Sequence, residues 1–192
     1  MAPKFLRSKI TVLLIIFLIF IGAMVTYSII NRPSTPETPA TRVLLETSMG
    51  NITIELYNDM PITSGNFVNL TEYGVYDNTI FHRVVPGFVI QGGDPTGTGQ
   101  GDPNIPAIRD ELPNKRSNVI GAVAMANKGP DTGSSQFFIN VVDNSANYDS
   151  DYPVFGKVVA GMEVVAAINT VHVDSNYRPV EPVNLIKAIM LT

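Results

Sequence analysis

The residues that could do chemistry are concentrated in the segment 79–95, which reads TIFHRVVPGFVIQGGDP. It carries one permanent cation, Arg83, followed by the aromatic Phe88 and the neutral amide Gln91. A proline–glycine pair at positions 86 and 87 separates two short apolar runs, a pattern that predicts a strand, a turn and a second strand. Pairing of these strands would bring the three side chains together. A cation beside an aromatic ring and an amide, without a nucleophile or base, indicates a site that binds and polarises its ligand.

The common catalytic and metal-binding patterns are missing from the sequence. Cysteine is absent, and neither His82 nor His172, the only histidines, has a neighbouring ligand at metal-binding spacing. Because neighbours on a strand alternate, we expect His82 on the face opposite Arg83. The serines at 134–135 lack the strand–turn–helix context of a hydrolase nucleophile, and the glycines at 97–99 lack the Lys-Ser/Thr of a phosphate loop. We therefore expect no metal and no cofactor.

The elements that must position these residues are mostly short strands. The periodicity predicts strands at 43–46, 51–57, 119–126, 135–141, 154–159 and 182–191, and helices at 61–74 and 162–170. Many short strands with two helices, in a folded part of about 150 residues, favour a closed or nearly closed β-barrel. Closure removes exposed strand edges.

The N-terminus has a different character. Residues 10–30 form an uncharged apolar stretch of 21 positions, and a helix of that length spans a bilayer core of roughly 30 Å. Basic residues precede it, so the positive-inside bias places the N-terminus in the cytoplasm. We expect 1–9 to be a basic cytoplasmic end, 10–30 a transmembrane signal-anchor in the cell membrane, 31–41 a Pro/Ser/Thr linker and 42–192 an extracytoplasmic domain. Cleavage of 10–30 as a signal peptide is the alternative.

Charge excludes one class of partner. Of the 13 basic and 17 acidic residues, four basic and one acidic lie in 1–41, so residues 42–192 carry a net charge of about −7. That charge argues against a nucleic acid as partner.

Asn51 and Asn69 begin glycosylation sequons, which also occur by chance. We expect the domain to be monomeric.

Five motifs identify a family when they are taken in order. They are FHRVVPGFVIQGGD (81–94), GTG (97–99), MAN (125–127), SSQFFI (134–139) and VFGKVVAGMEVV (154–165). Together they resemble the cyclophilin family of peptidyl-prolyl isomerases over residues 42–192. The resemblance implies a closed eight-stranded antiparallel β-barrel capped by two α-helices. It also implies an enzyme (EC 5.2.1.8) that acts on proline-containing polypeptides, here exported proteins as they fold.

The resemblance also assigns roles, one position at a time. Arg83 matches the catalytic arginine of the family, and Phe88 and Gln91 stand beside it. The walls of the proline pocket would be Phe88, Val89 and Phe138, although Val89 replaces a methionine common there. The groups that hold the substrate backbone would be Gln91, Ala126, Asn127 and Gln136, with Gly97 in the adjoining loop.

The segment 143–153, DNSANYDSDYP, departs from the family pattern. The family usually has Trp or Phe followed by Leu, and then His or Tyr. Counting back from VFGK puts Tyr152 at the His/Tyr position, Tyr148 near the Leu position and Asn147 near the Trp/Phe position. We therefore expect an altered pocket on this side, lined by Tyr148 and Tyr152. The departure favours an alternative function, a membrane-tethered module that binds proline peptides or holds clients with little catalysis.

Overall fold

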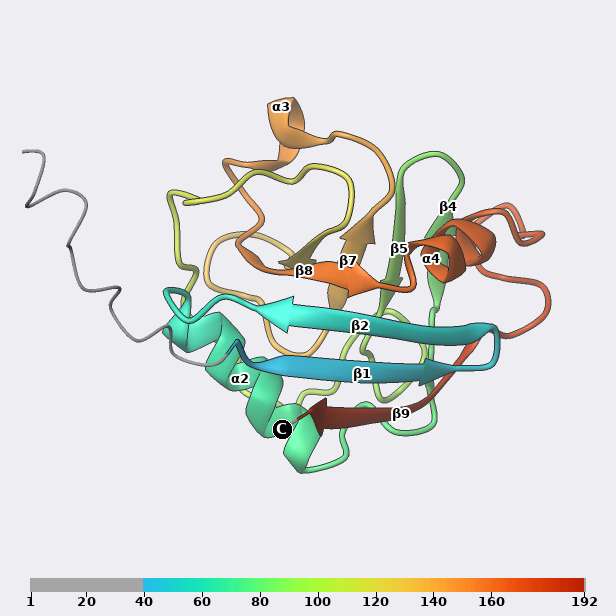
Figure 1. Cartoon of the computed structure of the whole chain (residues 1–192), viewed down its shortest axis with the longest axis horizontal. Helices are drawn as coiled ribbons and strands as arrows, with labels where there is room; N and C mark the ends of the chain where they lie inside the picture. The colour runs from blue at the N-terminus through green and yellow to red at the C-terminus, as the bar shows by residue number, and fades with distance from the viewer. Residues whose placement is uncertain (1–39, 192) are drawn as a thin grey trace, which may run out of the picture. The chain divides into compact units, whose positions relative to one another are not determined.

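The computed structural model describes residues 40–191, which are coloured in Figure 1. The predicted membrane segment 10–30 and nearly all of the linker 31–41 lie outside the described residues. Within 40–191, none of the helices has both the length and the apolar character that a membrane crossing requires.

The described residues form nine strands and three helices. In chain order these are β1 (Arg42–Thr47), β2 (Gly50–Leu56), α2 (Pro61–Glu72), β3 (Thr79–Ile80), β4 (Arg83–Val85), β5 (Val89–Gly92), β6 (Ala122–Met125), β7 (Phe137–Asn140), α3 (Ser145–Tyr148), β8 (Val154–Ala160), α4 (Met162–Asn169) and β9 (Asn184–Leu191). Both predicted helices are present, as α2 and α4. The single turn of α3 was not predicted because four residues are too few to show a helical period.

The strands form one curled antiparallel sheet with the order β3-β9-β1-β2-β8-β6-β7-β5-β4. The expectation of a closed eight-stranded barrel is therefore corrected to nine strands with two edges. β3 and β4 are adjacent in sequence but stand at opposite ends of this order, so the sheet curls until its edges approach each other. β3 and β4 do not pair with each other across the seam between these edges. A loop lies along the seam instead, where the backbone N–H of Val84 donates to the carbonyl of Tyr177 at 2.8 Å.

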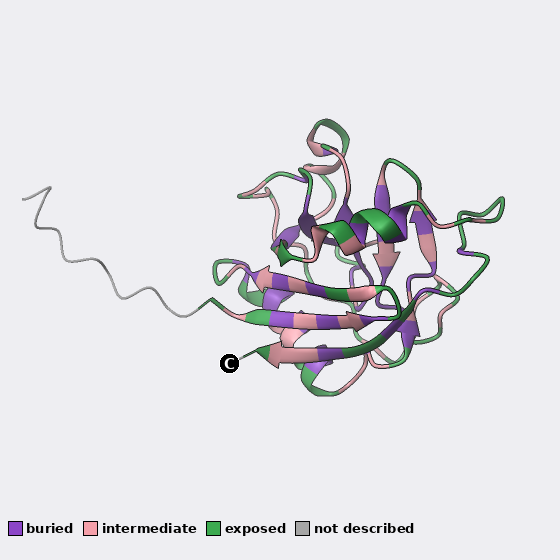
Figure 2. Ribbon diagram, turned by 45° about the vertical axis from the view of Figure 1, so that its right-hand side comes forward, coloured by how far each residue is buried: buried purple, intermediate pink, exposed green. Residues whose placement is uncertain are grey.

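The inner face of the curl holds the main hydrophobic core. β1 and β2 bury alternate side chains there, as their period of two predicts. The helix α2 contributes Phe67, which is fully buried. Its ring centroid lies 4.9 Å from that of Tyr76, 5.3 Å from that of Phe137 and 5.2 Å from that of Phe155. Figure 2 shows the buried positions recurring along the strands around this core.

A carboxylate distant in sequence satisfies the N-terminus of α2. The helix has no capping bond from its own Met60. Instead, Glu111 accepts hydrogen bonds from the backbone N–H of Ile62 at 3.2 Å and from that of Thr63 at 2.7 Å. The Thr63 hydroxyl also donates to Glu111 at 2.7 Å. A negative charge at a helix N-terminus is favourable, because the first N–H groups lack helical partners. The contact joins the 106–118 loop to α2.

We predict that Glu111→Ala lowers the free energy of unfolding by about 1–2 kcal/mol, the usual effect of losing a cap. Chemical denaturation measures this change. The control is Glu181→Ala, which removes an exposed carboxylate and should leave the unfolding free energy nearly unchanged. Equal stability of the two variants would show that Glu111 does not cap α2.

Candidate active site

Strand register places two of the predicted catalytic residues, Arg83 and Gln91, in one row with Phe138. Arg83 of β4 pairs with Gln91 of β5, Gln91 pairs with Phe138 of β7, and Phe138 pairs with Ala124 of β6. Directly paired residues project from the same face of a sheet. Val85 and Val89 form the next pair on that face. Side chains that sequence reasoning selected from two separate motifs, 81–94 and 134–139, therefore lie side by side.

An apolar cluster stands beside this row, separate from the main core. Val89, Ala124 and Phe138 are buried members, and Phe88, Ala126, Tyr148 and Tyr152 pack against them half-buried. The neighbour of Phe138 on β7, Phe137, belongs to the main core instead, as alternation along a strand requires.

Tyr148 is at the centre of the aromatic contacts. Its ring centroid lies 5.2 Å from that of Phe88 and 5.6 Å from that of Phe138, both in edge-to-face geometry. Tyr152 lies 4.5 Å from Tyr148 and 5.4 Å from Phe138. Asn147, by contrast, is exposed. The two tyrosines thus occupy the side of the cluster where the sequence predicts an altered wall. Burial raises the pKa of the Tyr148 hydroxyl, so this group is neutral near pH 7.

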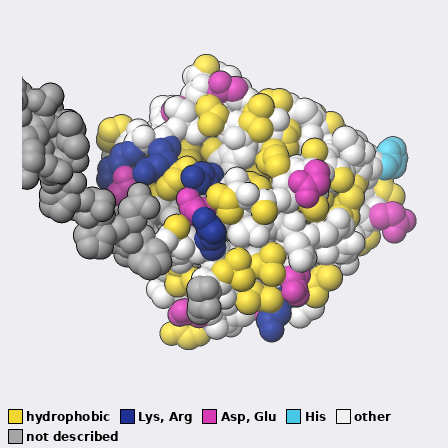
Figure 3. All heavy atoms as spheres, in the orientation of Figure 1, with side chains coloured by type: hydrophobic (Ala, Val, Ile, Leu, Met, Phe, Trp, Pro, Cys, Tyr) yellow, Lys and Arg dark blue, Asp and Glu magenta, His cyan; other side chains and the backbone are white. Residues whose placement is uncertain are grey.

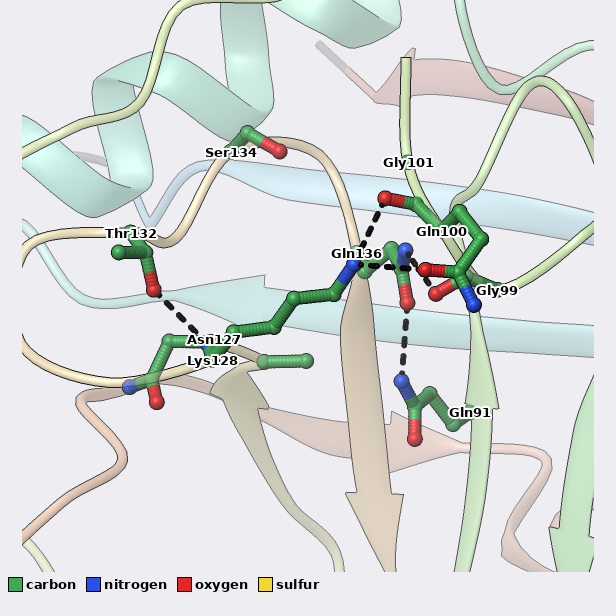
Figure 4. Close-up of a pocket in the computed structure, with 10 residues that line it drawn as sticks. Gln91, Gly99, Gln100, Gly101, Asn127, Lys128, Thr132, Ser134 and Gln136 are labelled. Carbon is green, nitrogen blue, oxygen red and sulfur yellow. Dashed lines mark hydrogen bonds between the residues drawn. The ribbon is translucent and has the colours of Figure 1, made fainter. Parts of the chain in front are cut away.

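A line of amides fixes the orientation of Arg83. Its Nη1 donates to Oε1 of Gln91 at 3.2 Å. Gln91 in turn donates through Nε2 to Oε1 of Gln136 at 2.9 Å, and Gln136 donates to the carbonyl of Gly99 at 3.1 Å. Figure 4 shows this line from Gln91 to the 99–101 loop. Each amide accepts on one side and donates on the other, so the whole line is oriented by the guanidinium.

Arg83 is not paired with any carboxylate of residues 40–191. The salt bridges of this part of the chain join Glu55 to Arg42 and Lys157, and Asp59 to Lys115 and Arg116. Figure 3 shows basic and acidic side chains lying next to each other in this way on one face. Arg83 is half-buried and keeps donors that its single bond to Gln91 does not use.

A polar pocket of about 140 Å³ opens beside the row (Figure 4). The predicted residues Gln91, Ala126, Asn127 and Gln136 line it. Gly97 does not, because it faces Ile80 and its carbonyl accepts from Arg178 at 2.9 Å. The lining residues that sequence reasoning missed are Gly99, Gln100, Gly101, Lys128, Thr132 and Ser134. The glycine spacing of GTGQG was the available signal, but it does not tell which glycine faces the pocket.

The side chain of Asn127 is occupied within the fold. Its Nδ2 donates to the carbonyl of Asp151 at 2.7 Å, and its Oδ1 accepts from the backbone N–H of Gly129 at 3.2 Å. In the part of the chain that the structure describes, its own backbone N–H and carbonyl take part in no backbone hydrogen bond. The backbone of Asn127 is therefore open to pair with a ligand.

The buried carboxylate of Asp94 shapes the loop beside Gln136. It accepts backbone N–H bonds from Thr96 at 2.9 Å, from Gly99 at 2.6 Å and from Gly101 at 3.1 Å. Burial alone would raise the pKa of this carboxyl, but the hydrogen bonds outweigh it and hold the pKa below its ordinary value. The preceding Gly93 has φ +81°, and a Cβ there would lie 2.6 Å from the carbonyl of Ser135. The loop is therefore fixed from both its start and its centre.

His82 lies beneath this loop. It is buried, and its Nδ1 has no hydrogen-bond partner among residues 40–191. Burial lowers its pKa, so the ring is neutral at pH 7. A Cβ at Gly99 would lie 3.2 Å from the ring carbon Cδ2, which together with a φ of +82° explains a glycine at this position.

The turn between β4 and β5 is held from α4. Oδ1 of Asn169 accepts from the backbone N–H of Gly87 at 2.7 Å, and its Nδ2 donates to the carbonyl of Val85 at 2.9 Å. Gly87 has φ +69°, which a glycine adopts without strain. This turn leads directly into Phe88 and Val89, so α4 sets the position of one wall of the apolar cluster.

Comparison with known proteins gives a consistent result. The family model "Cyclophilin type peptidyl-prolyl cis-trans isomerase/CLD" matches residues 42–190. The chain is 46% identical to peptidyl-prolyl cis-trans isomerase ppi1 of Schizosaccharomyces pombe over 153 residues, which cover 78% of this chain and 98% of that protein. It is 43% identical to peptidyl-prolyl cis-trans isomerase-like 1 of Aspergillus fumigatus, covering 78% of this chain and 94% of that protein.

Solved structures agree with these relatives. A cyclophilin-type isomerase of Cryptosporidium parvum superposes with a TM-score of 0.75 at 31% identity, covering 80% of this chain and 98% of that chain. A second crystal structure of that protein, obtained in the presence of the dipeptide Ala-Pro, superposes with a TM-score of 0.74 at 32% identity. It covers 79% of this chain and 99% of the other.

We predict that Asp94→Asn lowers the free energy of unfolding by about 1–3 kcal/mol at pH 7, because one acceptor oxygen becomes a donor facing N–H groups. The folded pKa of Asp94 is depressed. Its contribution is therefore complete above the ordinary pKa near 4 and is lost as the pH falls through the folded value. The difference between wild type and variant should be constant from about pH 7 to pH 5 and shrink below about pH 4.

Denaturation at a series of pH values measures this difference. Asp151→Asn is the control, because its carboxylate is exposed and accepts no hydrogen bond within residues 40–191. A wild-type advantage over Asp94→Asn that persists unchanged into strong acid would contradict the role of the Asp94 charge.

Proposed function

Because the chain belongs to the cyclophilin family of peptidyl-prolyl cis-trans isomerases, we propose that the row from Arg83 to Phe138 and its apolar cluster form the isomerase active site. Its substrates are proline-containing segments of exported polypeptides. The observation that carries the proposal is an oriented guanidinium, without a carboxylate partner among residues 40–191, beside an apolar aromatic cluster. The crystal structure of the Cryptosporidium relative in the presence of the dipeptide Ala-Pro supports a substrate of this class.

The reaction to be accelerated is a rotation about one bond. Resonance gives the peptide C–N bond a rotational barrier of about 18–20 kcal/mol, so an uncatalysed Xaa-Pro bond isomerises in roughly 10–100 s at 25 °C. Completing it in about a millisecond requires the barrier to fall by on the order of 6–7 kcal/mol. No covalent bond breaks, so the site needs neither a nucleophile nor a proton shuttle.

Arg83 supplies the polarising group in this mechanism. As the bond twists, the prolyl nitrogen becomes pyramidal and regains its lone pair. A guanidinium N–H donates to that lone pair, which the planar ground state does not offer. The interaction is therefore stronger in the transition state than in the ground state, as catalysis requires. The bond to Gln91 at 3.2 Å holds the guanidinium in place beforehand.

The apolar cluster binds the prolyl ring, and the backbone of Asn127 in the polar pocket binds the peptide backbone. Phe88, Val89, Phe138 and Tyr148 enclose the prolyl ring, and Tyr152 closes the cluster behind Tyr148. The free backbone groups of Asn127 hold the extended peptide on one side of the proline. With the ring and this side fixed, the acyl group on the other side of the bond rotates.

The setting of the domain follows from the sequence before residue 40. The apolar segment 10–30 anchors the chain in the cell membrane as a single-pass signal-anchor, with the basic residues 1–9 in the cytoplasm. The proline-rich linker 31–41 then holds the isomerase domain on the extracytoplasmic side. There the enzyme meets polypeptides that have just crossed the membrane.

A second candidate function is a tethered holdase that binds proline peptides with little catalysis. The observation that favours it is the exposed Asn147 at the position of the family's Trp or Phe. Arg83, Gln91 and Phe138 in one row favour the enzyme.

We predict that Arg83→Ala lowers kcat/KM for a proline peptide about 100-fold, the usual cost of losing one preorganised donor, with little change in the unfolding free energy. A protease-coupled isomerisation assay measures the rate on the full chain. The matched control is Arg109→Ala, which removes an exposed arginine without a hydrogen bond to the described residues. A variant as fast as wild type would refute the polarising role. A wild type that binds peptide but isomerises it at the uncatalysed rate would establish the holdase instead.

We further predict that protease added outside intact cells removes the domain and leaves a short membrane fragment, because the proposed topology puts residues 31–192 on that side of the membrane. Immunoblots of the membrane fraction before and after treatment measure this. A cytoplasmic protein followed in parallel controls for cell lysis. Protection of the domain in intact cells, with digestion after lysis, would contradict the outward orientation.

A further inference from the structure

The short helix α3 carries Tyr148, and buried side chains hold both of its ends. Asn144 precedes the helix, and its Nδ2 donates to Oδ1 of Asn140 at 2.8 Å and to the carbonyl of Phe88 at 3.4 Å. At the other end, Oδ1 of Asp149 accepts from the backbone N–H of Asn118 at 2.7 Å and from its Nδ2 at 3.1 Å. Each end of α3 is therefore attached to a different asparagine of the interior.

Asn118 and Asn140 join these two attachments beneath the helix. Nδ2 of Asn140 donates to Oδ1 of Asn118 at 3.2 Å and to the carbonyl of Ala122 at 3.1 Å. Asn118 also donates to the carbonyl of Tyr152 at 3.2 Å. A continuous chain of hydrogen bonds thus runs from Asp149 through three asparagines to the backbone of Phe88. We call it the asparagine chain, made of Asn118, Asn140 and Asn144.

The asparagine chain lies directly against the proposed proline pocket. Asn140 follows Phe138 by two positions on β7, so both project from the same sheet face, and Asn140 pairs with Val89 of β5. Asn118 and Asn140 are fully buried and Asn144 is 6% exposed. Both aromatic walls, Phe88 on one side and Tyr148 with Tyr152 on the other, are bonded to this chain through their backbones or helix ends.

Burial makes the geometry of the chain restrictive. An amide removed from water is costly unless its donors and acceptors are paired, and a displacement of α3 would break several of these bonds together. Burial would raise the pKa of the Asp149 carboxyl, but the bonds from Asn118 and Ser117 outweigh it and hold the pKa below its ordinary value. Asp149 is therefore ionised at neutral pH and accepts strong, charge-assisted hydrogen bonds.

We propose that Asn118, Asn140 and Asn144 are positioning residues that hold α3 at a fixed distance from the Phe88 backbone and so set the width of the proline pocket. The inference rests on the proposed isomerase function and names what determines the fit of the prolyl ring. None of the three asparagines bonds to Arg83, Gln91 or Gln136 in the described structure. Loosening the asparagine chain should therefore weaken substrate binding while the polarising step is retained.

The test uses the variant Asn144→Ala in the full chain, which removes both side-chain bonds of Asn144. We expect the Kd and KM for a proline peptide to rise about tenfold, the effect of about one net hydrogen bond to a backbone wall. The rate of exchange of the bound peptide should stay within about twofold of wild type. In the free protein, the ring contacts of Tyr148 with Phe88 and Phe138 should weaken in NMR spectra. Asn144→Ser, whose hydroxyl can donate one bond, should restore part of both effects.

The control is Thr71→Ala, which removes another buried hydrogen bond, donated to the carbonyl of Phe67 at 2.8 Å in α2. It should lower stability without changing the Kd or the ring contacts. Equal Kd values and unchanged rings in Asn144→Ala would overturn the proposal. The ring contacts are measured without peptide, so they test positioning even if the wild type proves not to be an isomerase.

If Asn144→Ala does not fold, the NMR signals of the side-chain amides of Asn140 and Asn144 in the wild type test the proposal instead. They should shift on peptide binding, and unmoved signals would overturn the proposal.

Discussion

Strand register is the constraint on which the rest of the molecule depends. Arg83, Gln91, Phe138 and Ala124 come from four strands, and only the pairing of β4 with β5, β5 with β7 and β7 with β6 aligns them. A slip of one residue between two of these strands would turn every side chain of the slipped strand to the opposite face, including its member of the row. The same register places Phe137 in the main core and Phe138 in the apolar cluster beside the row. The same strand register therefore packs the core on the inner face of the sheet and assembles the site on the outer face.

A line of hydrogen bonds connects the row to the neighbouring 94–101 loop. The guanidinium of Arg83 orients Gln91, which orients Gln136, which ends on the carbonyl of Gly99. The loop that presents this carbonyl is in turn wrapped around the carboxylate of Asp94. A fixed cation and a fixed anion thus stand at the two ends of one hydrogen-bonded path. Such a path is ordered before any ligand arrives, because its members have little freedom to reorient.

Much of the fold and part of the site could be predicted from the sequence, and the reasons differ. The hairpin of β1 and β2, the helix α2 and the strand–turn–strand around positions 86 and 87 have clear local patterns, and all were predicted. The two-residue β3 and the four-residue α3 are too short to have a period, so neither was predicted. The closed eight-stranded barrel that the resemblance implies was wrong in its strand count and its closure, since β3 and β4 are two edges of a nine-stranded sheet. Arg83 and Phe138 were found through motifs. Asp94 and the asparagine chain were not, because hydrogen bonds between residues distant in sequence have no local signature. Gly99, rather than Gly97, faces the pocket because the turn around Asp94 determines which glycine points inward.

The seam between β3 and β4 limits how an extended peptide can contact this protein. A bare edge next to a binding site invites an incoming extended segment to add itself as another strand. Here the outward N–H of Val84 is already taken by the carbonyl of Tyr177. An extended peptide therefore finds no free ladder position at Val84, in the middle of the strand that carries Arg83. Peptide contacts are left to the side chains of the row and its apolar cluster and to the backbone of Asn127, rather than to strand addition at this edge.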